Sequence, residues 1–370
     1  MKVLYLYSQA EKNMETSGEA KKMFMQLNGL KQNGLETDYY VIDRSQTINK
    51  LLIRIPFFNI HNRDFRRKFI EKAKDVDAVY LRKNIFDISY LKLLKELRRA
   101  YPYLKIIIEI PTYPYDFEWK NWKDFPLLLK DRLNRNKLKK YVDRFVVFSK
   151  DNMVFGVPAI LTSNGIDCNS VKKRSPKEID NYNINLLGVA GVERWHGYDR
   201  LIKGIKEYYD KVGNDVNLVF HIVGKGRESN NLEKLVADLS MQDHVLFHGF
   251  MHGTKLDEMF NRCDIGVGSL GMYRIGMYEG YTLKLREYMA RGIPFFYAYD
   301  DELIEKNGYF YFIKFPNDDT PIDVQKIIDF SKKLSKENSK IIAEKMNAYA
   351  EQELSWKHQM QPVADYIING

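Results

Sequence analysis

The stretch from Asp264 to Tyr299 constrains the fold of this chain more than any other. It reads as an apolar segment, a polar loop, a helical pattern and a second apolar segment. Thr282 is of a residue type that caps helix N-termini, Gly292 suits the left-handed residue after a helix, and Pro294 prevents continuation. The order strand, loop, helix, strand is the βαβ unit of a doubly wound parallel sheet, so an α/β fold is predicted.

The loop before this helix is the predicted ligand site, because ligands bind at the carboxyl ends of the strands in such sheets. Free backbone N–H groups at the helix start, from Leu283 and Lys284 onward, would attract an anion. Two carboxylates, Glu279 and Glu287, flank that helix start. A second interpretation is that Glu287 only pairs with Arg291 one turn on, which would stabilise the helix by about 0.2–0.5 kcal/mol.

Length and composition indicate a globular protein with two domains of ordinary size. The chain has 370 residues, 45% of them hydrophobic, and no apolar run approaches the about 20 residues that span a bilayer. Its two cysteines, Cys168 and Cys263, cannot form a disulfide framework, and both are expected to be structural. The first seven residues read as a buried strand and not as a signal peptide. We therefore expect a cytoplasmic protein.

The net charge of +9 suits nucleic acid, an anionic membrane or an anionic substrate. The segment 49–69 mixes basic and aromatic residues, which predicts peripheral contact with the inner face of an anionic cell membrane. A solvated helix face with long basic side chains explains the same segment equally well. The C-terminal half has no basic stripe with base-stacking aromatics, so nucleic acid is not an expected partner.

The first half alternates strand and helix patterns but has no G-x-G-x-x-G fingerprint, so a dinucleotide cofactor is not expected. Its loop IPTYPYDFEW offers Tyr113 and Tyr115 as flat surfaces for a sugar ring, and Glu118 as a carboxylate. Ser17 and Gly18, in the loop after the first strand, complete the predicted acceptor side. The alternative is that this aromatic loop buries its rings in the domain core.

The motifs of the second half resemble, in kind and order, those of the retaining glycosyltransferases of family GT4. They are NGID at 164–167, GVERWHG at 191–197, GKG at 224–226, HGF at 248–250 and EGYTLKLRE followed by ARGIP. The resemblance implies the GT-B fold, with two Rossmann-like, doubly wound domains facing across a cleft. Residues 1–166, with a helix at about 353–370 crossing back, would form the acceptor-binding domain, and 167–352 the nucleotide-sugar-binding domain.

The resemblance also implies roles for the two carboxylates: Glu279 would orient the donor sugar and Glu287 would hold the ribose. Most members bind the donor diphosphate with an arginine and a lysine, but Gly191 and His196 stand at those positions here. A W-H-G version occurs in polysaccharide-assembly members. Arg194 and Lys284 are the cations expected to replace the missing charge. The other expected donor contacts are Gly197, Gly224, Lys225, Gly226, Phe250, Met251, Thr282 and Leu283.

The activity implied is transfer of a sugar, with retention, from a nucleotide-sugar to a glycan or lipid-linked saccharide, as in bacterial capsular, exopolysaccharide or O-antigen assembly. The nucleotide-sugar is a substrate, with UDP favoured over GDP, and no cofactor or metal is expected. His244, His248 and His252 straddle a predicted strand and the loop after it, so no metal site is expected there. A non-catalytic subunit with the same fold is an alternative, because the expected phosphate-binding loop at 191–197 departs from the family pattern. A glycosidase would also need paired carboxylates, but it has no use for helix starts that bind phosphate.

Overall fold

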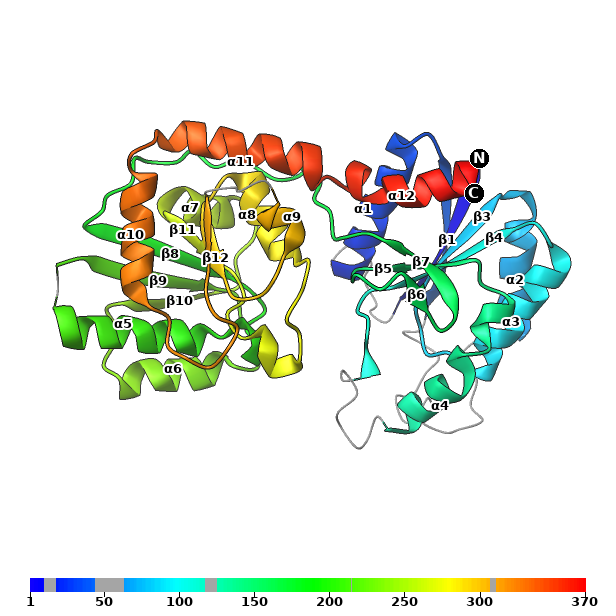
Figure 1. Cartoon of the computed structure of the whole chain (residues 1–370), viewed down its shortest axis with the longest axis horizontal. Coiled ribbons are helices and arrows are strands. Elements are labelled where there is room, and N and C mark those ends of the chain that lie inside the picture. The colour runs from blue at the N-terminus through cyan, green and yellow to red at the C-terminus, as the bar shows by residue number, and fades with distance from the viewer. Residues whose placement is uncertain (10–17, 44–62, 117–124, 214, 307–310) are drawn as a thin grey trace. The chain divides into compact units, whose positions relative to one another are not determined.

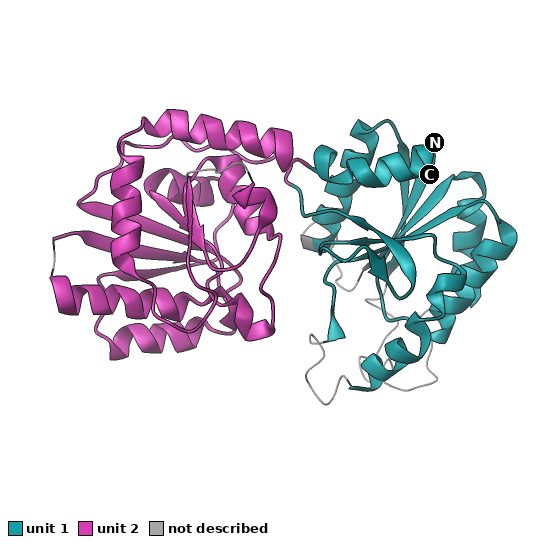
Figure 2. Cartoon of the chain, viewed as in Figure 1, with its two compact units in different colours: residues 1–165, 356–370 teal, residues 166–355 magenta. Residues whose placement is uncertain are grey.

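The computed structural model describes residues 1–9, 18–43, 63–116, 125–213, 215–306 and 311–370 (Figure 1). The chain forms two compact units: unit 1 is Met1–Gly165 with Trp356–Gly370, and unit 2 is Ile166–Ser355 (Figure 2). The predictions for Ser17, Glu118 and residues 49–62 of the basic segment lie outside the described residues.

Unit 1 is built on a seven-stranded sheet with the strand order β2-β1-β3-β4-β5-β7-β6. Neighbouring strands are parallel, except for β6, which pairs antiparallel with β7. The strands are β1 (Lys2–Gln9), β2 (Glu36–Asp43), β3 (Ala78–Arg82), β4 (Lys105–Ile110), β5 (Arg144–Val147), β6 (Met153–Val154) and β7 (Val157–Leu161). The helices are α1 (Gly18–Gln32), α2 (Arg63–Lys72), α3 (Ile88–Ala100), α4 (Phe125–Arg135) and α12 (Trp356–Asn369).

Helices cover both faces of the sheet of unit 1, which explains why its central strands are apolar on both sides. Along β1, Val3 and Tyr5 belong to the core shared with α1 and α12, whereas Leu4 and Leu6 belong to the core shared with α2 and α3. Successive side chains of a strand point to opposite faces, so one short strand supplies both cores.

The last helix of the chain, α12, packs in unit 1 although the preceding helix belongs to unit 2. Trp356, Met360 and Val363 are buried in the same core as Met23 and Leu27 of α1. The contact is close because two glycines face Trp356. A Cβ atom on Gly29 would lie 2.5 Å from the carbonyl oxygen of Trp356, and one on Gly165 would lie 2.8 Å from its Cα.

Unit 2 is built on a six-stranded parallel sheet with the strand order β10-β9-β8-β11-β12-β13. The strands are β8 (Asn183–Val189), β9 (Asn217–Val223), β10 (Val245–Gly249), β11 (Ile265–Val267), β12 (Phe295–Tyr297) and β13 (Phe312–Lys314). The helices are α5 (Tyr198–Val212), α6 (Ser229–Asp238), α7 (Thr254–Arg262), α8 (Leu283–Arg291), α9 (Glu302–Glu305), α10 (Val324–Leu334) and α11 (Ser339–Glu353).

Numbered within unit 2, the strand order is 3-2-1-4-5-6, the order of the Rossmann fold. The order reverses between β8 and β11, so the loops after these two strands border the expected ligand crevice. The predicted βαβ unit is confirmed as β11, α8 and β12, and Gly292 adopts the predicted left-handed conformation with φ 78°. Both cysteines are buried and free, as predicted. Within the described residues, no helix has the length and apolar character needed to cross a membrane.

The contact between α1 and α12 can be tested with Gly29→Ala. We expect this variant to be less stable, because overpacking costs about 1–3 kcal/mol, more than the up to about 1 kcal/mol of helix propensity that alanine gains. Urea denaturation followed by circular dichroism measures the change. Asn28→Ala, on the exposed side of the same helix turn, is the control and should be at least as stable as wild type. Equal stability of Gly29→Ala and Asn28→Ala would contradict the close packing.

Candidate functional site

The candidate site lies at the carboxyl edge of the unit 2 sheet, where the loops after β8 and β11 are in backbone contact. The N–H of Leu270 donates to the carbonyl of His196 at 2.8 Å, and that of Gly271 to the carbonyl of Trp195 at 3.1 Å. Gly197 has φ 62°, and a Cβ atom there would lie 2.6 Å from the nitrogen of Gly271. A side chain at Gly197 would therefore separate the two loops.

A second close contact joins the loops after β8 and β9. A Cβ atom on Gly224 would lie 1.8 Å from the carbonyl oxygen of Ala190, and one on Gly226 2.1 Å from that of Val192. The backbone N–H of Gly226 already donates to the Ser229 hydroxyl at 2.9 Å. Gly224 and Gly226 are expected donor contacts, and in this structure they let the backbone approach the neighbouring loop.

Two predicted donor contacts on these loops are open to solvent. Lys225 is exposed on the loop after β9. Gly191 is exposed as well, and a Cβ atom there would meet its nearest neighbour only at 4.0 Å. This part of the loop after β8 therefore has room beside it.

His196 is a buried, neutral side chain. The backbone N–H of Glu193 donates to its Nδ1 at 3.0 Å, and the Glu193 carboxylate accepts from the backbone N–H of His196 in return, forming a capping box. Burial and the nearby Lys284 ammonium lower the pKa of His196 to about 2. Nδ1 also lies 3.2 Å from the carbonyl oxygen of Glu193. The backbone N–H is closer and can only donate, so it assigns the acceptor role to Nδ1 and the ring proton to Nε2. His196 thus offers a neutral N–H donor just before the start of α5.

Lys284, in the first turn of α8, places a positive charge beside the end of the loop after β8. Its Nζ donates to the hydroxyl of Tyr198 at 3.0 Å and lies 5.2 Å from the centre of that ring. Burial lowers the pKa of Lys284 to about 7, against the opposing effect of Glu287. Lys284 lies close enough to His196 to help lower the pKa of its ring. The structure therefore brings together Lys284, His196 and the start of α8.

Tyr198 is the residue of this cluster that the sequence analysis did not identify. It is 1% exposed, and its hydroxyl fits against Gly188, where a Cβ atom would be 2.8 Å away. Its only sequence signal is an aromatic residue directly after the helix-start glycine. That signal is weak, because aromatic residues at such positions usually belong to the core.

The two carboxylates differ in their surroundings. Glu287 accepts from Nε of Arg291 at 2.8 Å, so the pairing proposed as its second interpretation is present. Its side chain is still 31% exposed. Glu279 is exposed, and its backbone forms a bridge with Asp300. Glu287 therefore stabilises the helix through Arg291 and still presents part of its side chain to solvent.

Thr282 occupies the N-cap position of α8, but its hydroxyl makes no capping hydrogen bond. It lies 2.6 Å from the hydroxyl of Tyr299 instead. The expected side-chain cap is therefore wrong. The first N–H groups of α8 therefore donate no hydrogen bond to the Thr282 hydroxyl.

The remaining predicted donor contacts lie near the same edge. Phe250 is 80% exposed and Met251 is half-buried, directly after Gly249, whose φ is 66°. Leu283 is 44% exposed. Arg194 is exposed, and its carbonyl accepts from Arg274 at 3.0 Å.

On the acceptor side, Tyr115 is 2% exposed, and its hydroxyl donates to Asp131 at 2.6 Å. Its ring packs edge-on against Phe155 in the core of unit 1. The expectation that Tyr115 offers a stacking surface is thus corrected, because the loop buries this ring. Tyr113 is half-buried against the same two rings, and Gly18 begins α1.

Two of the three histidines considered as metal ligands, His244 and His248, have hydrogen-bonding partners. Nδ1 of His244 lies 3.0 Å from the carbonyl of Leu218, and Nε2 of His248 lies 2.9 Å from Nδ1 of the buried His221. In the described part of the chain, no three histidine, cysteine, aspartate or glutamate side chains are grouped so that they could hold a metal ion.

Comparison with known proteins agrees with this architecture. Residues 169–300 match the family model described as "Glycosyl transferases group 1". No curated protein matches the sequence. Among solved structures, HepE from Anabaena in complex with UDP has a TM-score of 0.66 at 14% identity, with both chains covered completely. A glycosyltransferase from Rickettsia africae has a TM-score of 0.62 at 13% identity, covering 100% of this chain and 99% of its own.

A third similar structure is sucrose-phosphate synthase from Thermosynechococcus elongatus, with a TM-score of 0.61 at 13% identity and 98% of each chain covered. Likeness at these identities is a likeness of fold. The chain has the GT-B fold.

The cost of burying Lys284 can be tested with Lys284→Met. The lysine binds a proton in the unfolded chain up to a pH near 10.5, but in the folded chain only up to about 7. Wild-type stability should therefore gain from this group as the pH rises through that window. Below pH 7, we expect Lys284→Met to be more stable by on the order of 1–3 kcal/mol, and the gain should vanish towards pH 10.

Urea denaturation at pH 6, 7.5 and 9 measures this difference. Lys225→Met, which removes an exposed ammonium from a neighbouring loop, is the control and should differ from wild type by the same amount at each pH. A pH-independent effect of Lys284→Met would contradict the burial of its charge.

Proposed function

We propose that this chain is a glycosyltransferase that moves a sugar from a nucleotide-sugar, bound by unit 2, to a glycan or lipid-linked saccharide. The observation that carries the proposal is the cluster at the switch point of the unit 2 sheet. There a lysine, a neutral histidine N–H and the start of α8 come together. The match of residues 169–300 to a glycosyltransferase family model supports the same activity.

Transfer of a sugar from a nucleotide-sugar requires groups that stabilise negative charge, and this cluster contains such groups. When the bond between sugar and diphosphate breaks, negative charge grows on the leaving phosphate. Lys284 can stabilise that charge directly, His196 can donate from Nε2 without adding a positive charge, and the first N–H groups of α8 add a fixed dipole. GT4 members have a lysine at the position of His196. We propose that Lys284 takes the role of that lysine in this chain. Arg194, exposed on the same loop, is the second proposed cation.

The other roles are carried over from the family pattern as proposals. Glu279 would orient the donor sugar, and Glu287 would hold the ribose while paired with Arg291. Phe250 and Met251 would contact the base, and the open space beside Gly191 suits the diphosphate. Retention of configuration and independence from metal ions belong to the same proposal.

A UDP-sugar is the proposed donor. Solved structures of Anabaena HepE, similar in fold, are in complex with UDP and with UDP-glucose. The acceptor is proposed to be a saccharide of bacterial capsular, exopolysaccharide or O-antigen assembly. The lipopolysaccharide outer core galactosyltransferase WaaB, with a TM-score of 0.60 at 14% identity, shares the fold and supports this choice.

Donor binding can be tested by thermal shift with UDP, GDP, CMP and their sugar conjugates, with and without EDTA. We expect UDP and a UDP-sugar to raise the melting temperature of wild type, since a ligand at 100 times its Kd stabilises by about 2.7 kcal/mol. The shift should be insensitive to EDTA and much smaller in Glu287→Ala and Lys284→Met. Glu233→Ala, an exposed glutamate on α6, is the control and should keep the full shift.

The absence of a shift with every nucleotide would contradict the proposed donor class. A full shift in both site variants would contradict the placement of the site. A shift lost in EDTA would contradict metal independence. A normal shift without transfer of sugar to any tested acceptor would favour the non-catalytic alternative.

We further propose that the basic segment 49–69 touches an anionic membrane. The described part of this segment, residues 63–69, is the start of α2. There the Arg67 side chain is 75% exposed, and Arg66 pairs with Glu96 at 3.1 Å. Replacing Arg54, Arg66 and Arg67 by Ser should weaken binding to phosphatidylserine vesicles, by about 1 kcal/mol for each lost cation. Sedimentation with vesicles measures the bound fraction.

The control for the membrane experiment removes three exposed lysines from unit 2: Lys234, Lys326 and Lys332, each replaced by Ser. It changes the net charge by the same amount and should leave vesicle binding nearly unchanged. Because Arg66 pairs with Glu96, the melting temperature of the triple variant is measured first. Equal vesicle binding of the folded triple variant and wild type would overturn the proposal.

A further inference from the structure

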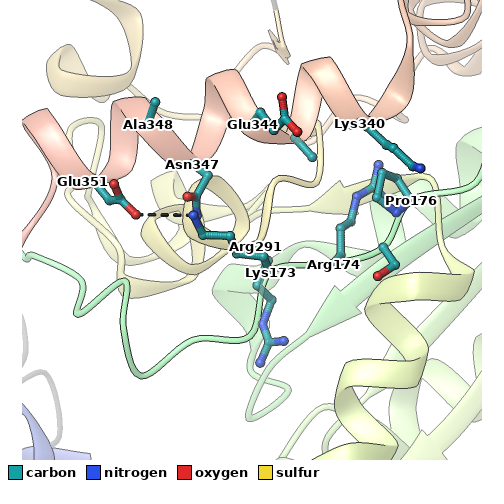
Figure 3. Close-up of a pocket in the computed structure, with 11 residues that line it drawn as sticks. Lys173, Arg174, Pro176, Arg291, Lys340, Glu344, Asn347, Ala348 and Glu351 are labelled. Carbon is teal, nitrogen blue, oxygen red and sulfur yellow. Dashed lines mark hydrogen bonds and ion pairs between the residues drawn. The ribbon is translucent and has the colours of Figure 1, made fainter.

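Unit 2 has a pocket of about 400 Å³ at the edge of its sheet opposite to the candidate donor site. One wall is the segment 173–176, and the other is a face of α11. Arg174 contacts the residues just before β11 and β12, which places the pocket at the amino ends of these strands. Figure 3 shows the lining side chains, with the ion pair of Lys173 and Glu351 towards one end.

Arg174 is the unusual residue of this pocket. It is only 7% exposed, and its guanidinium forms no salt bridge with a described carboxylate, although the charge of Asp264 acts on it. Its Nε donates to the carbonyl of Gly292 at 2.9 Å and its Nη1 to that of Cys263 at 2.8 Å. Burial lowers the pKa of Arg174 to about 10. A buried cation is costly unless it is paired, and carbonyl groups supply dipoles but no full negative charge.

The third nitrogen of Arg174 is available to a ligand. Nη2 has no hydrogen-bond partner among the described residues and is not sealed from solvent. Arg174 is also one of the residues that line the pocket. The geometry therefore leaves one face of a buried guanidinium directed at a pocket large enough for a small molecule.

The other charges of the pocket divide into paired and unpaired groups. Arg291 bonds to Glu287 and Asp257, and Lys173 pairs with Glu351 at 3.4 Å. By contrast, Lys340 and Glu344 form no ion pair with the described residues. They lie one helical turn apart on α11, with Lys340 towards the end of the pocket where Figure 3 shows Arg174.

We propose that this pocket binds a phosphate group, free or carried by a small hydroxylated molecule, between Arg174 and Lys340. Two cations match the charge of a phosphate dianion, and a guanidinium is well suited to phosphate oxygens. Glu344 can accept a hydrogen bond from a hydroxyl of the molecule that carries the phosphate. The site is separate from the donor site, since it lies at the other edge of the sheet and at the other end of α8.

Isothermal titration with inorganic phosphate and with glycerol 3-phosphate tests the proposal, using Lys284→Met as the parent so that phosphate binding at the donor site is suppressed. We expect saturable 1:1 binding to Lys284→Met. A further Lys340→Ala substitution should weaken it about tenfold, the usual effect of losing a charged hydrogen bond. Lys326→Ala, an exposed lysine on α10, is the matched control and should bind like the parent.

Two further variants sharpen the test. Arg174→Lys should also weaken phosphate binding, and if it fails to fold, Lys340→Ala carries the test alone. Glu344→Gln removes a repelling charge and should tighten inorganic phosphate several-fold, while glycerol 3-phosphate should gain less. The probe that binds more tightly identifies a free or an esterified phosphate as the ligand.

No saturable binding to Lys284→Met, or equal binding by Lys284→Met with and without Lys340→Ala, would overturn the phosphate site. These outcomes are independent of the proposed glycosyltransferase activity, which is tested by UDP. A protein that binds phosphate through Lys340 but no nucleotide would keep the pocket and lose the donor site.

Discussion

The backbone contact between the loops after β8 and β11 is the constraint on which the candidate site depends. Two hydrogen bonds join the loops, and they form only because Gly197 and Gly271 let the backbones meet. This contact sets where α5 and α8 begin relative to each other. As a result Lys284, at the start of one helix, reaches Tyr198, at the start of the other. The position of the charge is thus determined by packing of the backbone and not by the reach of a flexible side chain alone.

The same contact explains how a change at position 196 can be accommodated. A lysine at this position, as in the GT4 pattern that the motifs of this chain resemble, would place its charge on the loop after β8. Here the neutral His196 is held in a capping box, and the charge comes from α8. A lysine at 196 beside Lys284 would put two ammonium groups together in a partly buried place, which is unfavourable. The histidine and the lysine are therefore best understood as one paired arrangement.

Much of the fold could be predicted from the sequence, because its signals are local. Gly292 and Pro294 marked the end of α8, and the apolar segments around that helix marked β11 and β12. The site was harder, because its contacts join distant parts of the chain. Nothing near Tyr198 indicates that its hydroxyl meets Lys284, and Tyr113 and Tyr115 look alike although only Tyr115 is almost completely buried. Thr282 has the right type for a cap, but its hydroxyl turns to Tyr299, 17 residues on.

The charges at the two ends of α8 suggest where ligand binding is worth most. A helix stabilises cations at its C-terminus, where Arg174 bonds to the carbonyl of Gly292 and Arg291 pairs with two carboxylates. It destabilises a cation at its N-terminus, where Lys284 is also half-buried and has the lowered pKa expected of a poorly stabilised ammonium. An anion bound there would offset both costs at once, because it would pair with the ammonium and lie at the positive end of the helix dipole. We therefore expect the charged form of Lys284 to be most stable when an anion is bound beside it.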